Sequence, residues 1–357
     1  MKILFLVPYP LKISPSQRFR FEQYFSVLTA AGHSYEIQSF LKLQDGKILF
    51  RKGNIVRKTF TLIRGLIRRF FILFRVPNFD RVFIHREALP AGPPLIEWII
   101  VMVLKKKIIY DFDDAIWLTD RGDEPRWLKT IKWRSKVKSI CRWSYKVSGG
   151  NEYLCSYARQ FNKQVIFNPS TIDTERVHTH DRFPALRSGE TTIGWTGSHS
   201  TLKYLTALEG ALKQLEKEYP HVKFVIIADQ PPKLSLKSIH YIPWCAETEM
   251  EALRKIDIGI MPLPDDEWSK GKCGLKILQY LALEIPAVAS PVGVNSDMII
   301  HGKTGYLAKG MQEWIHYLSA LIIQDGLRRQ LGSSGRQYVQ ANYSVKSNSS
   351  NFLSLFE

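Results

Sequence analysis

The sequence has few cysteines and no long, uninterrupted hydrophobic run. Four cysteines are scattered over the 357 residues without any C-x-x-C pair: Cys141, Cys155, Cys245 and Cys273. This spacing argues against a disulfide scaffold and against a zinc site, and it fits a reducing compartment. The run Leu95–Leu104 contains Glu97 and is too short to cross a bilayer.

The N-terminal stretch MKILFLVPYPL lacks the features of a secretory signal peptide. Its apolar run is short, Pro8 interrupts it, and no small-residue cleavage site follows. We therefore expect a first buried strand here and a cytoplasmic protein.

Acidic residues are scarce in the first half of the chain. Residues 1–172 hold 30 lysines and arginines against 13 acids, which accounts for the whole net charge of +17. Residues 173–357 hold 20 of each kind. The asymmetry predicts an anionic partner for the first half alone: membrane phospholipid, a phosphorylated acceptor or nucleic acid.

Two segments contain no acid at all. Residues 51–75 and 126–146 each hold eight lysines and arginines, and the second also holds Trp127, Trp133 and Trp143. Basic amphipathic segments with aromatic residues are typical of helices in an anionic membrane interface, so we expect a peripheral protein at the cytoplasmic face. RNA binding would look similar, although no RNA-binding motif is present, and a solvated basic helix is the third alternative.

Strands and helices alternate in two halves of the sequence. Strands are expected in the first half at 2–7, 35–39, 81–85, 107–111 and 146–149, and in the second half at 192–195, 223–228, 239–242, 257–261 and 287–290. The polar segment 168–190 joins the halves. This alternation predicts an α/β protein of two Rossmann-like domains, whose parallel sheets face each other across a cleft.

Residues 257–293 read as a strand, a charged loop, a helix, a turn and a second strand. Lys272, Lys276 and Gln279 are spaced so that one helix face would carry all three, at the carboxyl end of a parallel strand. Two cations and an amide at a helix start suit a diphosphate and a ribose. A solvated lysine face is the competing interpretation.

Small residues follow the first strand of the second half. Gly194, Thr196, Gly197 and Ser198 are expected to form a turn before a helical stretch that contains Lys203. Such residues allow backbone amides to approach a phosphate closely. An ordinary strand-to-helix turn would have the same composition.

Three carboxylates close a strand in the first half: Asp111, Asp113 and Asp114. Buried carboxylates are unfavourable unless paired, so packing alone rarely explains such a group. A divalent-metal D-x-D site, carboxylates that hold acceptor hydroxyls, and capping of a following helix all remain open.

Basic residues and a histidine lie at two other strand ends. His85 and Arg86 close the preceding strand, and Arg18 and Arg20 follow the first strand. His85 could act as a base or bind a sugar, and the arginines suit a phosphate or carboxylate. Structural or surface roles are the alternatives.

Taken together, these motifs resemble glycosyltransferase family 4, within the GT-B fold. The resemblance covers nearly the whole chain and is weakest over residues 42–75. It rests on KILFLVPYP, SPSQRFR, VFIHRE, YDFDDAIW, VSGGNEYL, FNPSTID, IGWTGSHSTLKYL, GKCGLKILQYLALEIPAVASPVGV and GKTGYLA in this order. The family motif of two glutamates falls on Gly271 and Gln279 here, so this chain departs from it in the manner of a GKCGxKxLQY subgroup.

The resemblance implies that a sugar passes, with retention, from a nucleotide diphosphate to a hydroxyl of a lipid-linked glycan, in surface polysaccharide or glycoconjugate synthesis. It implies an acceptor-binding, membrane-facing domain over 1–171, a nucleotide-sugar-binding domain over 172–340 and a returning C-terminal helix over 341–357. No cofactor or metal and no nucleic acid are expected. A sugar-nucleotide epimerase or a non-catalytic nucleotide-sugar-binding module is the alternative.

The resemblance also implies a role for each candidate residue. The catalytic candidates are Asp113, Lys272 and Lys203. The donor-binding candidates are Gly194, Thr196, Gly197, Ser198, Trp244, Lys272, Cys273, Gly274, Lys276 and Gln279. The acceptor-binding candidates are Arg18, Arg20, His85, Arg86, Asp111 and Asp114.

Overall fold

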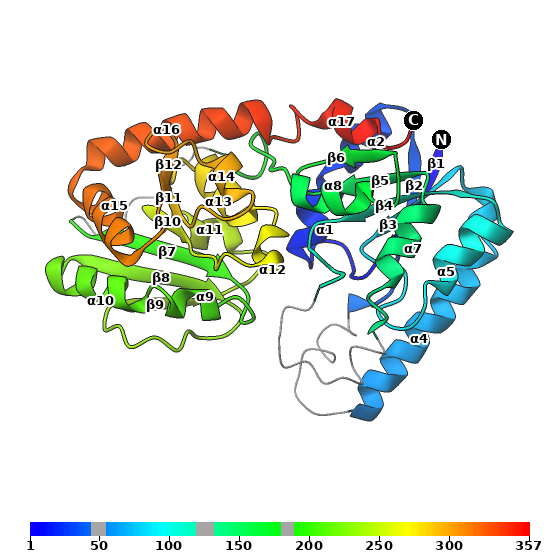
Figure 1. Cartoon of the computed structure of the whole chain (residues 1–357), viewed down its shortest axis with the longest axis horizontal. Helices are drawn as coiled ribbons and strands as arrows, with labels where there is room; N and C mark the ends of the chain where they lie inside the picture. The colour runs from blue at the N-terminus through cyan, green and yellow to red at the C-terminus, as the bar shows by residue number, and fades with distance from the viewer. Residues whose placement is uncertain (44–54, 119–131, 180–188) are drawn as a thin grey trace. The chain divides into compact units, whose positions relative to one another are not determined.

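The computed structural model describes residues 1–43, 55–118, 132–179 and 189–357. The chain forms two compact units, each built around one parallel sheet with flanking helices (Figure 1). The first unit comprises residues 1–170, 271–273 and 349–357, and the second comprises residues 171–270 and 274–348. Because the tripeptide Gly271–Cys273 makes its contacts with the first unit, the second unit is interrupted there.

The first unit holds a six-stranded sheet in the order β2-β1-β3-β4-β5-β6. Its strands are β1 Lys2–Val7, β2 Ser34–Ser39, β3 Arg81–His85, β4 Lys107–Phe112, β5 Lys146–Gly149 and β6 Val165–Phe167. All of the pairings between these strands are parallel. The inner strands are buried on both faces, as in α/β proteins whose helices cover both sides of a sheet.

The second unit also holds six strands, in the order β12-β11-β10-β7-β8-β9. Its strands are β7 Thr191–Gly197, β8 Val222–Ala228, β9 Ile239–Pro243, β10 Ile258–Met261, β11 Ala287–Ala289 and β12 Gly305–Leu307. The pairings are again parallel. The ten strands expected from the sequence are all present, whereas the three-residue strands β6 and β12 were not predicted.

Helices of different lengths connect the strands of the first unit. They are α1 Pro15–Arg20, η1 Glu22–Tyr24, α2 Phe25–Ala30, α4 Ile55–Leu73, η2 Val76–Asn78, α5 Leu95–Trp98, the π-helical η3 Ile99–Val103, α7 Lys136–Trp143 and α8 Glu152–Arg159. The C-terminal α17, Ser349–Leu353, belongs to this unit too. Its Phe352 stacks on Tyr24 with ring centroids 4.2 Å apart, so the end of the chain is tied to the first core.

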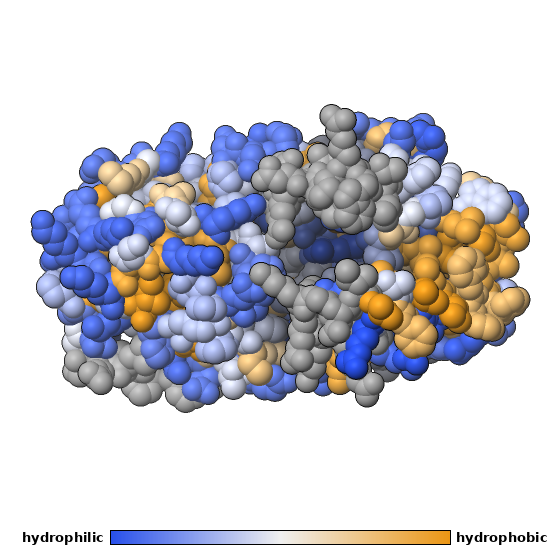
Figure 2. Space-filling view, turned by 90° about the horizontal axis from the view of Figure 1, so that it is seen from below, coloured by the Kyte–Doolittle hydropathy of each residue, from blue (hydrophilic) through white to orange (hydrophobic). Residues whose placement is uncertain are grey.

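Helix α4 carries large apolar side chains on its outward face. Phe71 and Phe74 are among its exposed residues. Figure 2 shows hydrophobic surface on this side of the first unit. Within the four ranges that the structure describes, no helix has the length and apolar character needed to span a membrane.

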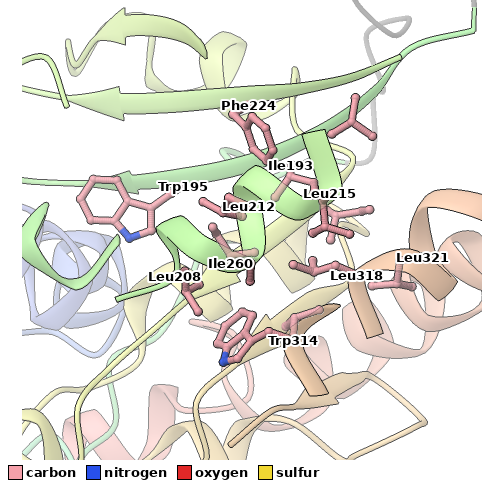
Figure 3. Packing of buried hydrophobic residues seen from close by; sticks show 14 of the residues in the cluster. Ile193, Trp195, Leu208, Leu212, Leu215, Phe224, Ile260, Trp314, Leu318 and Leu321 are labelled. Carbon is pink, nitrogen blue, oxygen red and sulfur yellow. The ribbon is translucent and has the colours of Figure 1, made fainter. Parts of the chain in front are cut away.

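The helices of the second unit cover both faces of its sheet. They are α9 Lys203–Thr206, α10 Glu209–Glu218, α11 Glu249–Leu253, α12 Glu267–Lys270, α13 Leu275–Ala282, α14 Asn295–Met298, α15 Met311–Ile323 and α16 Asp325–Asn342. Alternate strand residues, such as Ile193 and Trp195, pack against Leu212 of α10 and Leu318 of α15 (Figure 3). Burial of each large side chain here stabilises the unit by roughly 1.5–3 kcal/mol.

On the opposite face of the second sheet, side chains lie directly against the backbone of two strand glycines. A Cβ on Gly259 would lie 2.4 Å from the Tyr280 ring of α13. A Cβ on Gly194 would lie 2.2 Å from Ile256. These glycines therefore let α13 and the residues before β10 pack directly on the sheet.

Candidate active site

The carboxyl end of the first sheet holds a buried cluster centred on Asp111. His85 ends β3 and pairs in register with Asp111 of β4, and His85 Nδ1 lies 2.7 Å from Asp111 Oδ2. Arg20 of α1 forms an ion pair with the same carboxylate, and Ser148 Oγ donates to Oδ1 over 2.6 Å. Burial alone would raise the pKa of Asp111, but the Arg20 charge and the His85 hydrogen bond lower it below its usual value.

Arg20 and Asp111 are both fully buried, so neither is open to a ligand in this structure. Arg20 also donates to the Asn168 carbonyl, and its Nη2 donates to Ser148 Oγ over 3.1 Å. Both residues were predicted from the sequence to bind the acceptor. In the structure they instead position their neighbours.

His85 also contacts Ser16 through its second ring nitrogen. Its Nε2 lies 2.7 Å from Ser16 Oγ. Because a carboxylate only accepts hydrogen bonds, His85 Nδ1 carries a proton in its contact with Asp111. The Ser16 hydroxyl also hydrogen-bonds Asp113. Sequence reasoning missed Ser16, although it lies in the SPSQRFR motif.

Arg86 joins the two carboxylates that follow β4. Its Nε donates to Asp113 Oδ1 over 2.8 Å, and its Nη2 donates to Asp114 Oδ2 over 2.6 Å. Burial would raise the pKa of Asp113, but the charges of Arg86 and His85 lower it strongly, so Asp113 is ionised. The Asp113 side chain is 11% exposed, less than those of Asp114 and Arg86, and it remains accessible to solvent.

The Arg86 backbone is in the left-handed region, with φ at 61°. Its amide donates to the Asp111 carbonyl over 2.7 Å, which holds the turn after β3 in place. A non-glycine residue there is strained by roughly 1 kcal/mol or more, and such strain concentrates at functional sites. The turn aims the guanidinium at the carboxylates.

The tripeptide Gly271–Cys273 reaches the same cluster from far along the sequence. Lys272 Nζ donates to Asp114 Oδ1 over 2.9 Å, and the Lys272 carbonyl accepts from Asn151 Nδ2 over 2.8 Å. Cys273 Sγ lies 3.2 Å from the Asp113 carbonyl, and burial raises the pKa of this thiol, so it remains a donor. Asp113, Asp114 and Lys272 are therefore brought together.

Lys272, Lys276 and Gln279 were predicted to share one helix face, and this prediction is wrong for Lys272. Helix α13 begins at Leu275, after Gly274 in the left-handed conformation with φ at 65°. Lys272 therefore precedes the helix, and its side chain turns to Asp114. The spacing was helical, but the glycine ends that periodicity because it reverses the backbone.

The expected turn over Gly194–Ser198 is also wrong in its first residues. Strand β7 continues to Gly197, so Gly194 and Thr196 lie inside the sheet. The Thr196 amide donates to the Tyr280 hydroxyl over 3.0 Å. Only Gly197 and Ser198 lie where the strand ends.

The lysine candidates of the second unit rest on aromatic rings. Lys276 Nζ lies 5.3 Å from the centroid of the Trp195 ring, and Lys203 Nζ lies 5.3 Å from that of Tyr204. These cation–π contacts hold the ammonium groups at the carboxyl end of β7 and in α9. In the first unit, the Arg18 guanidinium lies 5.1 Å from the Phe19 ring.

A buried carboxylate that sequence reasoning missed links the remaining donor candidates. Glu249 Oε1 accepts from Trp244 Nε1 over 3.0 Å and from Gln279 Nε2 over 3.3 Å. Glu249 and Gln279 are both buried. The acidic run ETEME concealed Glu249, because only its partners distinguish it from its exposed neighbours.

Of the three interpretations of the carboxylates, the described residues show neither a capped helix nor a metal-binding group. Residues 113–118 form turns and no helix, so they do not cap one. Among the described ranges, no group of three or more histidine, cysteine, aspartate or glutamate residues is arranged to hold a metal ion. The carboxylates face cations instead: Arg20, Arg86 and Lys272.

The two parallel sheets with flanking helices define a GT-B fold, the architecture of a large class of glycosyltransferases. The chain superposes on sucrose-phosphate synthase from Thermosynechococcus elongatus with a TM-score of 0.72, at 14% identity, over 100% of this chain and 98% of that one. It superposes on HepE from Anabaena, solved in complex with UDP and glucose, with a TM-score of 0.67, at 14% identity, over 100% and 99% of the chains.

Residues 190–324 match the family model described as "Glycosyl transferases group 1", which supports transferase chemistry for this part of the chain. A curated relative, "Glycosyltransferase 1 domain-containing protein 1" from Xenopus tropicalis, is 34% identical over 68 residues. That match spans 19% of this chain and 20% of the relative.

Proposed function

We propose that this protein transfers a sugar from a nucleotide diphosphate to a hydroxyl of a lipid-linked glycan, with retention, in surface polysaccharide or glycoconjugate synthesis. One observation carries the proposal: an ionised carboxylate, Asp113, is held by Arg86 and Ser16 at the carboxyl end of β4. Open α/β sheets bind ligands at this edge. The group 1 match over residues 190–324 supports the reaction class.

The second unit is proposed to bind the donor. The group 1 match lies in this unit, and HepE, a structural neighbour, was solved with UDP and with UDP-glucose. Gln279 would bind the ribose hydroxyls, with its amide fixed by Glu249 and Trp244. Lys276 and Lys203 would neutralise the diphosphate, together with amides after Gly197.

The first unit is proposed to present the acceptor. Asp113 would accept a hydrogen bond from the attacking hydroxyl and orient it, while Arg86 keeps the carboxylate ionised. His85 and Ser16 hold Asp113 from its other side. Arg20, Asp111 and Ser148 position this set without touching substrate.

Charge must be met on the leaving diphosphate as the bond between sugar and phosphate breaks. We assign this role chiefly to Lys272, which would exchange its Asp114 contact for the diphosphate. A preorganised donor to a developing oxyanion contributes about 3–4 kcal/mol to the transition state. The leaving phosphate would take the acceptor's proton on the face from which it departs, which gives retention.

We propose that no metal takes part, because cations already face the carboxylates of the first unit. Transfer that is unchanged by EDTA supports this part of the proposal. Loss of transfer in EDTA and its recovery with Mg²⁺ or Mn²⁺ would contradict it.

The protein is further proposed to act at the cytoplasmic face of the membrane, through the basic segments 51–75 and 126–146. Of these, residues 51–54 and 126–131 lie outside the described residues. The described part of the first segment is the basic helix α4, and the second contains α7. An anionic surface would concentrate the protein where lipid-linked acceptors occur.

The test is a thermal-shift screen against UDP-, GDP- and dTDP-sugars, followed by release of free nucleotide without acceptor. We expect one donor to stabilise the protein and to be hydrolysed slowly. Binding without hydrolysis or transfer favours a non-catalytic module, which Gly271 in place of a glutamate would explain. Interconversion of two nucleotide sugars favours an epimerase. Tight RNA binding without any nucleotide-sugar binding would contradict the transferase, the non-catalytic module and the epimerase alike.

A further inference from the structure

The face of helix α4 that lies against the core includes two polar residues, Thr61 and Arg69. The stripe that faces the core consists of Thr61, Gly65, Arg69 and Ile72, all buried. The helix of a globular protein normally turns its apolar stripe toward the core. Here most of the large apolar residues point outward.

Arg69 fixes this orientation. Its Nε donates to the Ala88 carbonyl over 2.9 Å, and its Nη2 donates to the Val7 carbonyl over 2.7 Å. Its Nη1 donates to the Gln38 carbonyl over 2.8 Å. These carbonyls lie at or just beyond the ends of β1, β2 and β3. A rotation of the helix that buried its phenylalanines would turn Arg69 outward, remove all of these bonds and leave the three carbonyls without this donor.

Gly65 adds a second constraint on α4. A Cβ at this position would lie 2.6 Å from the ring of Phe40, which is buried. The helix therefore lies close to the residues after β2 only because this position has no side chain. The outward apolar face is thus set by specific contacts on the inner side.

The outward face forms one apolar surface with the neighbouring helices. Phe71 is 66% exposed and Phe74 is 80% exposed. The other exposed members are Val56, Phe60, Ile63, Ile67 and Phe70 of α4, with Leu95 and Trp98 of α5 and Met102 and Val103 of η3. Figure 2 shows hydrophobic surface gathered over this region. Contiguous exposed apolar surface of this kind marks an interaction site.

A groove of about 440 Å³ runs between α4 and η3 within this surface. Apolar side chains line it: Phe70, Leu73, Phe74, Pro77, Ile99 and Leu104. At its rim, Lys106 Nζ donates to the carbonyls of Pro77 and Phe79, over 2.8 Å each. Lys105, next to the groove residue Leu104, is exposed. The groove is therefore apolar inside and positively charged at one edge.

We propose that this groove binds a hydrocarbon chain of an anionic membrane lipid, while the outward face of α4 enters the headgroup–acyl boundary. Charge complementarity selects this occupant, because residues 51–75 contain eight basic residues and no acid. A second copy of this chain would bring like charges together at the same face, which is unfavourable. An anionic lipid satisfies the groove and its rim together. This inference rests on the proposed membrane location and adds the face and the lipid chemistry to it.

The first experiment measures co-sedimentation with vesicles of phosphatidylcholine, with and without roughly one third phosphatidylglycerol, at low salt. We expect binding to the anionic vesicles only, and roughly tenfold weaker binding for Phe71→Ser and for Phe74→Ser, since each removes one aromatic anchor. Ile323→Ser is the matched control, because Ile323 is an equally exposed apolar residue of the second unit. Equal binding of all four proteins would overturn the proposal.

A second experiment separates the groove from the rest of the face. Phosphatidylglycerol with a photoreactive acyl chain should cross-link to residues 70–77 or 99–104, as mapped by mass spectrometry. Cross-links confined to other regions would overturn the groove assignment. A wild-type dimer that Phe74→Ser disperses, with no vesicle binding, would show that a second copy covers the face instead.

Donor hydrolysis in solution distinguishes this inference from the proposed function. Phe71→Ser and Phe74→Ser should hydrolyse the donor at the wild-type rate while they lose vesicle binding. If no nucleotide sugar is bound or hydrolysed but the lipid cross-links appear, the transferase proposal fails and the lipid site stands. If hydrolysis occurs without any lipid binding, the lipid site fails alone.

Discussion

Lys272 Nζ lies 2.9 Å from Asp114 Oδ1, although 158 residues separate them along the chain. The contact holds the loop before α13 against the carboxyl end of β4. In the proposed mechanism Lys272 exchanges this contact for the leaving diphosphate.

Replacing Lys272 by alanine should lower the rate of sugar transfer by about two to three decades, because one preorganised donor to the leaving group is lost. Steady-state kcat with the identified donor and acceptor is the measurement. Lys270→Ala is the matched control, since Lys270 is close in sequence but pairs with Glu267 at the surface. Wild-type turnover in Lys272→Ala would remove Lys272 from the mechanism.

Replacing Asp111 by asparagine should destabilise the fold by roughly 3–5 kcal/mol at neutral pH, because Arg20 would stay buried without its counter-charge. Urea unfolding monitored by circular dichroism measures this. Glu152→Gln at the exposed pair with Arg159 is the control and should change little. Equal effects of the two substitutions would contradict the role of the buried pair.

The same variant should change how stability depends on pH. The pKa of Asp111 in the folded protein is lower than its ordinary value of 3.8. The ionised group therefore stabilises the fold fully above pH 3.8, and this stabilisation is lost as the pH falls through the folded pKa. Wild-type unfolding free energy should fall more steeply below about pH 4 than that of Asp111→Asn. Parallel curves would show that Asp111 is not responsible.

Replacing Gly150 by alanine should lower transfer roughly a hundredfold while the protein remains folded, because displacement of a catalytic loop by about 1 Å has this effect. The new Cβ would lie 2.5 Å from Cys273 Sγ and would push the Lys272 loop away. Adding Cys273→Ala should restore part of the rate by making room. Gly210→Ala, in α10 with its nearest contact at 3.4 Å, is the control. No recovery in the double variant would reject the steric explanation.

Replacing Glu249 by alanine should raise KM for the donor more than it lowers kcat. The buried carboxylate orients Gln279 and Trp244, which we assign to donor binding rather than to bond breaking. Glu251→Ala on the same helix is the control, because Glu251 pairs with Lys255 at the surface. An unchanged KM in Glu249→Ala would exclude this group from the donor site.

Replacing Gly65 by alanine should destabilise the first unit by roughly 1–3 kcal/mol through overpacking against Phe40. An alanine normally stabilises a helix interior by up to about 1 kcal/mol relative to glycine. Gly326→Ala in α16 is therefore the control with the opposite expected sign, since nothing lies within 4 Å of its new Cβ. Stabilisation by both substitutions, in thermal unfolding, would show that α4 is not held against Phe40.

Candidate residues could be predicted from the sequence where their neighbours along the chain marked them. His85, Asp113 and Asp114 were chosen as candidates because they lie at or just after strand ends, and the strand ends of a parallel sheet meet at one edge. Ser16 and Glu249 were missed because nothing in their neighbourhood along the chain distinguishes them; their partners come from β3, β4 and α13. Lys272 was placed on a helix because its spacing was helical, while α13 begins only after Gly274, so Lys272 precedes it.

The sequence by itself determined the βα alternation and the strand positions, because apolar runs and turn residues are read over a few neighbouring positions. The resemblance of its motifs to a known family implied the GT-B fold. The tertiary structure decided three further matters: which charge faces each carboxylate, which unit holds Gly271–Cys273, and which side of α4 faces outward. These depend on contacts between residues far apart in sequence. The apolar stripe of α4 was visible from the start, but only the buried guanidinium of Arg69 shows that it points away from the core.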